Sequence, residues 1–355
     1  MESEFGGPIV SGRGTSGASR TPGGHGGSGV SFPVPPAELE APAQRPWRHF
    51  AEEREALGAG LAGAGVGGGA PGGGGEGTRA ARRSVEVRRD ASGLRSGRTV
   101  EFYKYVNDDL ADARSKDWPL VGSPWPVLAI TLAYTHFCLR LGPRLMRDRQ
   151  PFDVDRLIVA FDLFQILACG WMTVQGFYYF PGRYKFFCEP IDYSNEEYSL
   201  YAVHLAWLYY MLKILDLLDT VFFVLRKKTS QITFLHVYHH AIMIFTGYIA
   251  VKYVGGGHFI LLGHLNSFVH TVMYTYYLIT NIRPEYKRSI WWKKHITQLQ
   301  IAQFLTLFVQ NFPTLFWDDC DIHFAWRLAL TVQVTFMTLM FLDFYRRAYR
   351  AKSAD

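Results

Sequence analysis

The sequence holds only four cysteines, and its first 30 residues contain no long apolar segment. The missing apolar segment argues against a secretory signal peptide. Large apolar side chains are scarce throughout residues 1–100, which contain 24 of the 34 glycines. Such a chain cannot bury enough apolar surface to offset the entropy of ordering it. We therefore predict a disordered Gly/Ala-rich tail over residues 1–100 and no folded domain there.

An arginine-rich run lies near the end of this tail, at residues 79–89. One interpretation is a solvated, flexible segment. The alternative is an arm that contacts nucleic acid or directs targeting. Beyond residue 100 the basic residues lie between apolar stretches and not on one face of a domain, which disfavours the alternative. We therefore expect no nucleic-acid partner.

Charge is scarce in seven later stretches, each mostly apolar and about 20 residues long, the length that crosses a hydrocarbon core of about 30 Å. They are Pro119–Leu141, Leu157–Phe180, Leu200–Leu225, Ile232–Val251, Phe259–Thr280, Ile296–Phe316 and Phe324–Tyr345. A soluble protein could bury one such helix, but not seven in succession. We predict an all-α integral membrane protein with seven transmembrane helices over residues 101–350, followed by a short cytosolic end at residues 351–355.

The loops between these stretches differ in their content of basic residues. Lys and Arg are frequent in residues 144–156, 226–228, 283–294 and 346–352, and infrequent in residues 179–199, 252–258 and 317–322. Since basic loops remain in the cytosol, we expect the first set to be cytosolic and the second set to face the other side. Cys188 and Cys320 belong to two loops of the second set. An oxidising lumen permits a disulfide there, and we predict that they are bridged.

Ionisable residues at membrane depth are costly, so each is a candidate functional residue. His236, His239 and His240 form an HxxHH pattern inside one stretch. At about 100° per residue the three imidazoles share one helix face. Neutral imidazoles can bind a metal, shuttle protons or act as nucleophiles. The alternative, three imidazoles that serve only as hydrogen-bonded core groups, is disfavoured by their clustering.

Three further polar groups follow helical spacing. They are Lys213, Asp216, Asp219 and Thr220; Asn266, His270, Met273 and Tyr274; and Thr297, Gln300 and Gln303. Lys213 can pair with Asp216 at i, i+3. Each group also has a purely structural interpretation: a buried ion pair without chemistry, a core histidine, or amides that only hold helices together. Gln231, near the histidine pattern, carries little weight alone.

The single HxxHH pattern limits the chemistry that is available. Membrane di-iron desaturases and hydroxylases need several histidine boxes, whereas the other histidines of this chain are solitary, so we expect no metal and no cofactor. Imidazole can instead act as nucleophile or base, while basic residues at the cytosolic ends of the helices hold a phosphorylated anion. A non-catalytic seven-helix receptor or transporter is the third interpretation.

The sequence resembles the very-long-chain fatty acid elongases, the membrane condensing enzymes of the endoplasmic reticulum. The resemblance covers roughly residues 100–350 and rests on four motifs in the family's order and spacing. These are Lys213-x-x-Asp216-x-x-Asp219-Thr220, His236-x-x-His239-His240, Asn266-x-x-x-His270-x-x-Met273-Tyr274 and Thr297-x-x-Gln300-x-x-Gln303. One departure is visible, because the family usually has glutamate where this chain has Asp216.

The resemblance implies condensation of a long-chain acyl-CoA with malonyl-CoA, which gives a 3-oxoacyl-CoA, carbon dioxide and CoA. It implies a multi-pass protein of the endoplasmic reticulum membrane in which six of the seven helices enclose a substrate tunnel. The implied partners are the lipid bilayer, the two CoA substrates and, as candidates, the reductases and dehydratase of the elongation cycle and a second copy in a homodimer.

The same resemblance suggests roles for the polar residues. No cysteine belongs to a polar stripe, so we predict that His239 attacks the acyl thioester while His236 and His240 fix its tautomer and orientation. Asn266 and His270 are expected to stabilise the enolate or oxyanion. The expected substrate-binding residues are Lys213, Asp216, Asp219, Arg226, Lys228, Gln231, Tyr276, Lys293, Thr297 and Gln300.

Overall fold

A computed structural model describes residues 99–179, 182 and 184–350 of the chain. These residues form helices, turns and loops, and no strand occurs among them. The prediction of an all-α fold is therefore confirmed for this part of the chain. Almost all of the predicted glycine-rich tail, and the predicted cytosolic end at residues 351–355, lie outside the described residues.

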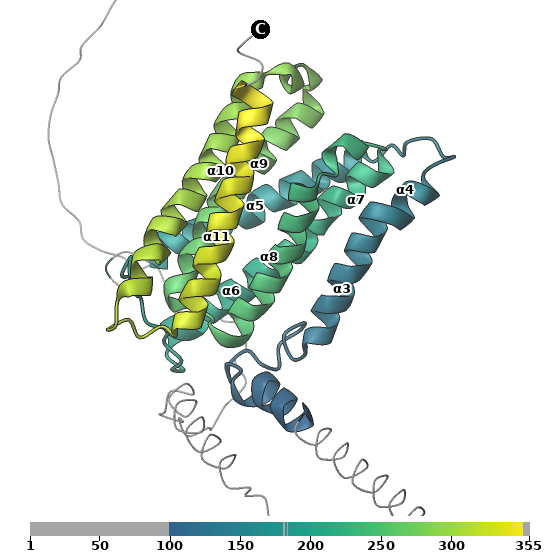
Figure 1. Cartoon of the computed structure of the whole chain (residues 1–355). Helices are drawn as coiled ribbons and strands as arrows, with labels where there is room; N and C mark the ends of the chain where they lie inside the picture. Colours follow the sequence, from purple (N-terminus) through teal and green to yellow (C-terminus); the bar gives the residue numbers. More distant parts are fainter. Residues whose placement is uncertain (1–98, 180–181, 183, 351–355) are drawn as a thin grey trace, which may run out of the picture. The chain divides into compact units, whose positions relative to one another are not determined.

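Each predicted apolar stretch coincides with helical structure (Figure 1). The helices are α3 (Pro124–His136), α4 (Gly142–Leu145), α5 (Asp155–Tyr179), α6 (Glu197–Leu215), α7 (Leu217–Leu225), α8 (Phe234–Tyr253), α9 (Ile260–Ile282), α10 (Ile290–Asn311) and α11 (Phe324–Tyr345). Shorter turns are η1 (Tyr105–Asp109), η2 (Phe137–Leu141), η3 (Thr229–Gln231), η4 (Gly257–Phe259), η5 (Pro284–Arg288), η6 (Phe312–Phe316) and η7 (Arg346–Arg350). The π-helical turn η2 joins α3 to α4.

The predicted helix Leu200–Leu225 is divided into α6 and α7, which meet at Asp216. The backbone N–H of Asp219 bonds the carbonyl of Asp216 at 3.2 Å, an i to i+3 bond that tightens the helix locally. Such tightened turns inside a helix often mark functional positions. The division therefore falls at the carboxylate that the sequence marks as a candidate site residue.

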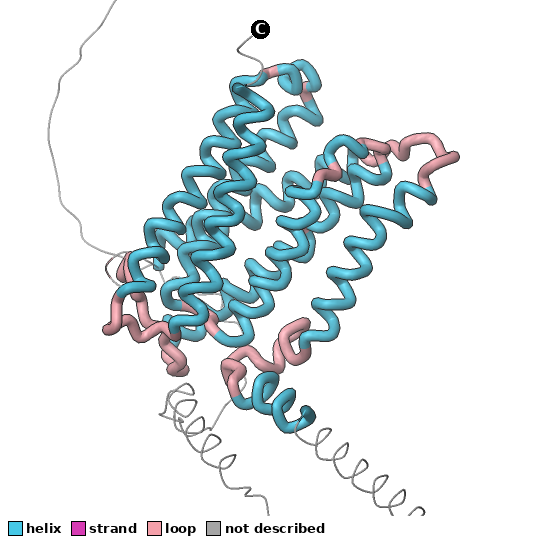
Figure 2. The backbone as a smooth tube through the Cα atoms, viewed as in Figure 1, coloured by secondary structure: helices cyan, strands magenta, loops and turns pink. Residues whose placement is uncertain are grey.

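The helices pack mainly in neighbouring pairs. Helix α5 lies along α9, α9 along α10, α10 along α11, and α8 lies between α3 and α6 (Figure 1). Apolar side chains such as Val127, Tyr210 and Ile244 fill the space where α3, α6 and α8 meet. The loops gather at the two ends of the bundle, as Figure 2 shows.

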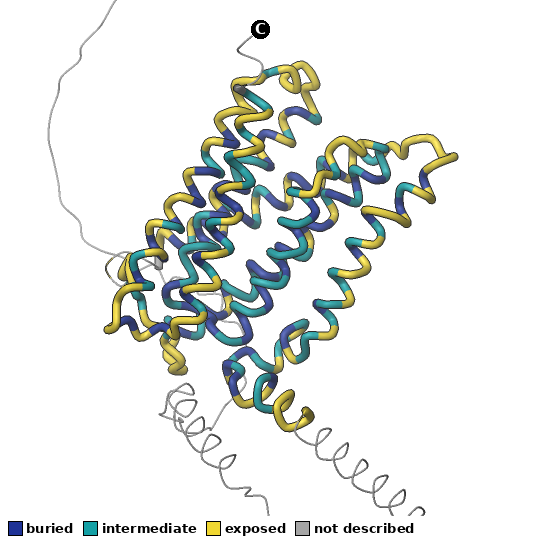
Figure 3. The backbone as a smooth tube through the Cα atoms, in the orientation of Figure 1, coloured by how far each residue is buried: buried dark blue, intermediate teal, exposed yellow. Residues whose placement is uncertain are grey.

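Among the described residues, three helical segments are long and apolar enough to cross a membrane: Asp155–Tyr178, Phe234–Tyr253 and Phe324–Tyr349. Helices α9 and α10 carry buried polar residues such as Asn266 and Gln303. Large apolar residues, among them Leu167 and Phe177, are exposed. Exposed positions recur along the helices between buried and intermediate ones (Figure 3). This distribution agrees with a helical membrane protein, while seven crossing helices and an enclosed tunnel stay predictions.

A disulfide joins Cys188, in the loop after α5, to Cys320, in the loop before α11. This is the pair that the loop positions predict. Beside it, the backbone N–H of His258 donates to the carbonyl of Glu189 at 3.1 Å. Burial lowers the pKa of His258 to about 4, so the ring is neutral at pH 7. Its Nε2 lies 3.0 Å from Asn311 Oδ1, and these contacts fix the loops at this end of the bundle.

Candidate active site

Lys213 lies at the centre of a buried polar cluster built from α6, α7 and α9. Its Nζ donates to Asp216 Oδ2 at 2.7 Å and to Asn266 Oδ1 at 3.1 Å, and it lies 3.3 Å from His270 Nδ1. Lys213 and Asp216 are each 2% exposed. The i, i+3 spacing predicts the first of these contacts, and the aspartate reaches Lys213 although it is shorter than glutamate.

Asp216 also accepts hydrogen bonds on its other oxygen. Gln165 Nε2 of α5 donates to Asp216 Oδ1 at 2.6 Å, and the Tyr274 hydroxyl donates to the same atom at 3.2 Å. The Tyr274 hydroxyl also bonds Asp219 Oδ2 at 2.7 Å. The carboxylate of Asp216 is thus held from α5, α6 and α9 together.

The bonds of Lys213 fix the tautomer of His270. An ammonium group donates only, so His270 Nδ1 must be the acceptor, and the proton of the neutral ring lies on Nε2. Asn266 Oδ1 receives bonds from Lys213 and, at 2.8 Å, from the Tyr209 hydroxyl. With both lone pairs of that oxygen used, the amide presents Nδ2 as a donor. No described residue bonds His270 Nε2 or Asn266 Nδ2, so both donors are available to a ligand.

The histidine pattern begins in the first turn of α8. Thr233 caps this helix, and its hydroxyl accepts a bond from the backbone N–H of His236 at 3.2 Å. The rings of His236 and His240 have centroids 4.4 Å apart, and those of His239 and His240 lie 5.6 Å apart. His240 therefore contacts both other rings, and the three imidazoles lie together, as their spacing predicts.

His236 and His239 have different surroundings. His236 Nε2 lies 2.8 Å from Thr220 Oγ1, which in turn lies 2.8 Å from the Tyr134 hydroxyl of α3. His239 has ring contacts with His240 and with Phe341 of α11, and neither of its nitrogens bonds another described residue. The ring nitrogens of His239 are thus available to a ligand, whereas His236 Nε2 is engaged with Thr220.

Thr220 links the two groups of residues, because it belongs to the Lys213 motif and its Oγ1 lies 2.8 Å from His236 Nε2. The described part of the chain contains no group of three His, Cys, Asp or Glu side chains that could hold a metal ion. The structure thus brings together the predicted residues of three motifs around one buried region.

The remaining predicted residues lie apart from this cluster. Arg226 pairs with Asp155 at 3.1 Å, and Lys228, Gln231 and Lys293 are exposed in loops or at a helix end. The buried residue Thr297 donates to the Lys293 carbonyl within its own helix. Gln300 Nε2 lies 3.8 Å from Met273 Sδ and links α10 to α9, and Tyr276 is buried on α9.

Sequence reasoning missed Gln165 and Tyr209. Gln165 lies three residues after the buried Asp162, so two polar side chains share one face of an otherwise apolar stretch. That spacing could have identified Gln165 as a candidate site residue. Tyr209 gave no comparable signal, because tyrosine is common in this chain and its partner Asn266 belongs to another helix.

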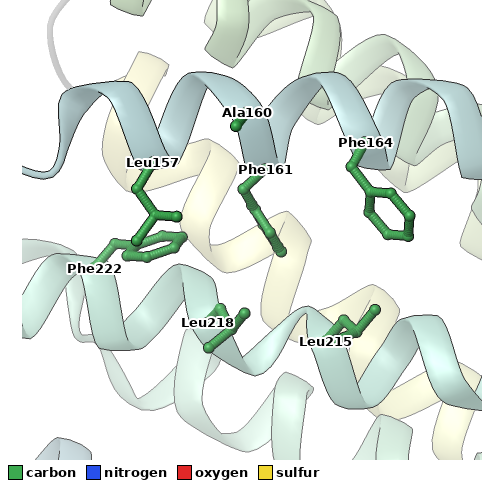
Figure 4. Close-up of a pocket in the computed structure, with 7 residues that line it drawn as sticks. All are labelled: Leu157, Ala160, Phe161, Phe164, Leu215, Leu218 and Phe222. Carbon is green, nitrogen blue, oxygen red and sulfur yellow. The ribbon is translucent and has the colours of Figure 1, made fainter.

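A groove of about 380 Å³ lies between α5 and the α6–α7 pair (Figure 4). Its lining is apolar and consists of Leu157, Ala160, Phe161, Phe164, Leu215, Leu218 and Phe222. No predicted site residue lines it. Leu215 and Leu218 flank Asp216 in the sequence, and both are exposed on the outside of the bundle. The groove is therefore distinct from the polar cluster.

Comparison with known proteins gives concordant matches. The ELO model, described as the GNS1/SUR4 family, matches residues 119–355. A very long chain fatty acid elongase of Aedes aegypti is 41% identical over 256 residues, 71% of this chain and 71% of that protein. Very long chain fatty acid elongase 7 of Rattus norvegicus is 39% identical over 72% of this chain and 91% of its own length. Very long chain fatty acid elongase 4 of Homo sapiens is 36% identical over 71% of this chain and 80% of its own length.

Proposed function

Because this chain belongs to the GNS1/SUR4 (ELO) family, we propose that it is a very-long-chain 3-oxoacyl-CoA synthase. Membership and the names of the relatives support an enzyme of fatty acid elongation. The finer proposal is that it joins a long-chain acyl-CoA to malonyl-CoA through an acyl-histidine. The observation that carries it is the imidazole of His239, neither of whose nitrogens bonds another described residue. Its ring contacts His240, which contacts His236, and His236 bonds Thr220 of the Lys213 motif.

In the first step of this proposal, a neutral nitrogen of His239 attacks the carbonyl carbon of the acyl-CoA thioester. The new C–N bond gives a tetrahedral oxyanion, for which His270 Nε2–H and Asn266 Nδ2–H are candidate donors. The C–S bond then breaks, and the CoA thiolate leaves with the proton that His239 loses. The product is an acyl-imidazole on His239.

In the second step, malonyl-CoA binds and the bond to its carboxyl carbon breaks, which releases carbon dioxide. The electron pair that remains forms an enolate, and this carbon attacks the acyl-imidazole carbonyl. The C–N bond to His239 breaks as the new C–C bond forms, and the imidazole takes up a proton. The 3-oxoacyl-CoA is two carbons longer than the starting acyl group.

The proposal includes the surroundings of the reaction. Seven helices cross the membrane of the endoplasmic reticulum, and six of them enclose the acyl chain. The CoA phosphates bind at the Lys- and Arg-rich end, where Arg226, Lys228 and Lys293 are candidate partners. Support for this arrangement comes from three membrane-length helices in the described part of the chain, from exposed apolar side chains and from the elongase relatives.

The test is a trapping experiment on the purified full-length protein. Incubation with a long-chain acyl-CoA alone should release CoA and add the mass of one acyl group, located on His239 by peptide mapping. Addition of malonyl-CoA should discharge the adduct as 3-oxoacyl-CoA. His239→Ala should abolish both events, whereas His204→Ala, at an exposed histidine of α6, should leave them unchanged. Condensation retained by His239→Ala, or CoA release that requires malonyl-CoA, contradicts the acyl-histidine.

A further inference from the structure

Gln165 is a fully buried amide in the middle of α5, a helix whose composition is otherwise strongly apolar. Its Nε2 donates to Asp216 Oδ1 at 2.6 Å. Its Oε1 has no hydrogen-bond partner in the described part of the chain. A buried amide with an unused acceptor destabilises a protein, so a gain elsewhere must favour glutamine at this position.

The two oxygens of the Asp216 carboxylate have different hydrogen-bond donors. Oδ1 accepts from Gln165 and Tyr274, and Oδ2 accepts from Lys213. Since donors on both oxygens restrict rotation of the carboxylate, the position of Oδ2 is fixed. Oδ2 in turn orients Lys213 Nζ toward Asn266 Oδ1 and His270 Nδ1. A chain of hydrogen bonds thus runs from α5 to the two donors of the proposed oxyanion site.

We propose that Gln165 is a positioning residue for the condensation reaction. It holds Asp216 so that Lys213 keeps the tautomer of His270 and the orientation of the Asn266 amide. The inference rests on the proposed function, because these two donors matter only if an oxyanion or enolate forms beside them. The only polar contact of Gln165 among the described residues is Asp216, so it acts through that carboxylate.

The length of the side chain at position 216 explains the positioning role of Gln165. Aspartate is one methylene shorter than glutamate, so its carboxylate remains closer to its own helix and further from the neighbouring ones. The long side chain of Gln165 reaches from α5 to contact it. A glutamate at position 216 would carry its carboxylate one bond further from the backbone, so the bonds to Lys213 at 2.7 Å and from Gln165 at 2.6 Å could not both persist without a rearrangement. Gln165 and Asp216 are therefore a matched pair, in which the length of one side chain compensates for the other.

The first test compares two Gln→Met variants of α5 in the full-length protein. Gln165→Met keeps the length of the side chain and removes the donor. We expect kcat to fall about 10- to 100-fold, because small displacements of groups at a reaction centre have effects of this size. The KM for acyl-CoA and malonyl-CoA should stay within about twofold, since no proposed CoA contact changes. Gln175→Met is the control, because Gln175 accepts a bond from Tyr201 and has no link to Lys213.

The second test is rescue by the matched substitution. Asp216→Glu in a Gln165→Ala background, in which the shorter residue 165 leaves room for the longer carboxylate, should raise kcat at least about fivefold above Gln165→Ala alone. Asp216→Glu in the wild-type background should lower kcat. All rates are divided by the amount of folded protein, measured by size-exclusion chromatography. A merely structural role of Gln165 would reduce that amount and leave the corrected kcat unchanged.

Three results would overturn the inference: a corrected kcat for Gln165→Met within about twofold of wild type, an equal loss in Gln175→Met, or no rescue by Asp216→Glu. The wild-type assay separates this inference from the proposed function. A wild-type protein without malonyl-CoA-dependent 3-oxoacyl-CoA formation refutes the proposed function. An active wild type with an equally active Gln165→Met variant refutes only the role of Gln165.

Discussion

Thr220 is the residue on which the position of His236 depends. It is fully buried at the centre of three helices, and its hydroxyl contacts Tyr134 of α3 and His236 of α8, each at 2.8 Å. A hydroxyl has one proton and two lone pairs, so it can serve both partners at once. Its removal would leave the buried Tyr134 hydroxyl and the partly buried His236 ring without these bonds.

Thr220→Val tests this arrangement, because valine has the shape of threonine without the hydroxyl. We expect the free energy of unfolding to fall by about 1–3 kcal/mol, the usual cost of buried polar groups left unpaired. We also expect kcat to fall about tenfold, because His236 and the His240 ring that it contacts lose a fixed position. Thermal unfolding and steady-state kinetics in detergent measure the two effects.

Thr220→Ser is the matched control, since serine keeps the hydroxyl and loses only a methyl group. It should retain most of the activity. Equal kcat values for the valine and serine variants would show that the hydroxyl has no part in holding the histidines.

Spacing in the sequence predicts contacts within a helix and fails between helices. The pair Lys213–Asp216 follows from i, i+3 geometry, and so does the shared face of His236 and His240. The approach of His270 to Lys213 depends on how α9 packs on α6, which no spacing within one helix specifies. For the same reason the hydrogen bond between Gln165 and Asp216 could not be predicted, although both polar residues are visible in the sequence.

At the scale of elements, apolar length predicts where the helices lie, and polar side chains determine where they are interrupted. The stretch Leu200–Leu225 is apolar enough to read as one helix, yet the backbone tightens at Asp216. Mean hydropathy registers composition and not backbone geometry, so it does not show this division. Mean hydropathy also does not show where two helices pack closely, because such packing depends on single small residues.

Gly247 permits such a close approach between α8 and α6. A Cβ atom at this position would meet Tyr210 Cδ2 at 2.9 Å, and Tyr210 is fully buried. Gly170 of α5 is a matched site, because a Cβ atom there would meet its nearest neighbour, Thr271 Cγ2, at an ordinary 3.8 Å. The same substitution can therefore be compared at a crowded position and at an open one.

Gly→Ala substitutions at these two positions should change the free energy of unfolding differently. Alanine favours a helix by roughly 1 kcal/mol over glycine, so Gly170→Ala should be neutral or stabilising. At position 247 the clash with Tyr210 outweighs this gain, and we expect a loss of about 1–3 kcal/mol, as for other overpacked cores. Thermal unfolding of both variants in the same detergent measures the difference. A Gly247→Ala variant that is as stable as Gly170→Ala would mean that the helices separate without cost.

At the scale of the whole molecule, one covalent bond joins distant parts of the described chain. Cys188 and Cys320 are separated by 132 residues, and their disulfide connects the loop after α5 to the loop before α11. Arg327 of α11 lies near the same end, where its guanidinium donates to the carbonyls of Thr314 and Trp317. These contacts hold one end of the bundle closed. The opposite end carries the basic loops and has no disulfide among the described residues.

Loss of this disulfide should destabilise the bundle, because it closes a long loop and so restricts the unfolded chain. Cys188→Ser and Cys320→Ser should each lower the free energy of unfolding by about 2–4 kcal/mol, and reductant should have the same effect on the wild-type protein. The double variant should be no less stable than either single variant, since the bond is already lost in each. Thermal unfolding of the four proteins measures their stabilities, and thiol labelling under denaturing, non-reducing conditions shows whether the bond is present. Additive losses in the double variant, or labelling of Cys188 in the unreduced wild-type protein, would contradict the bond.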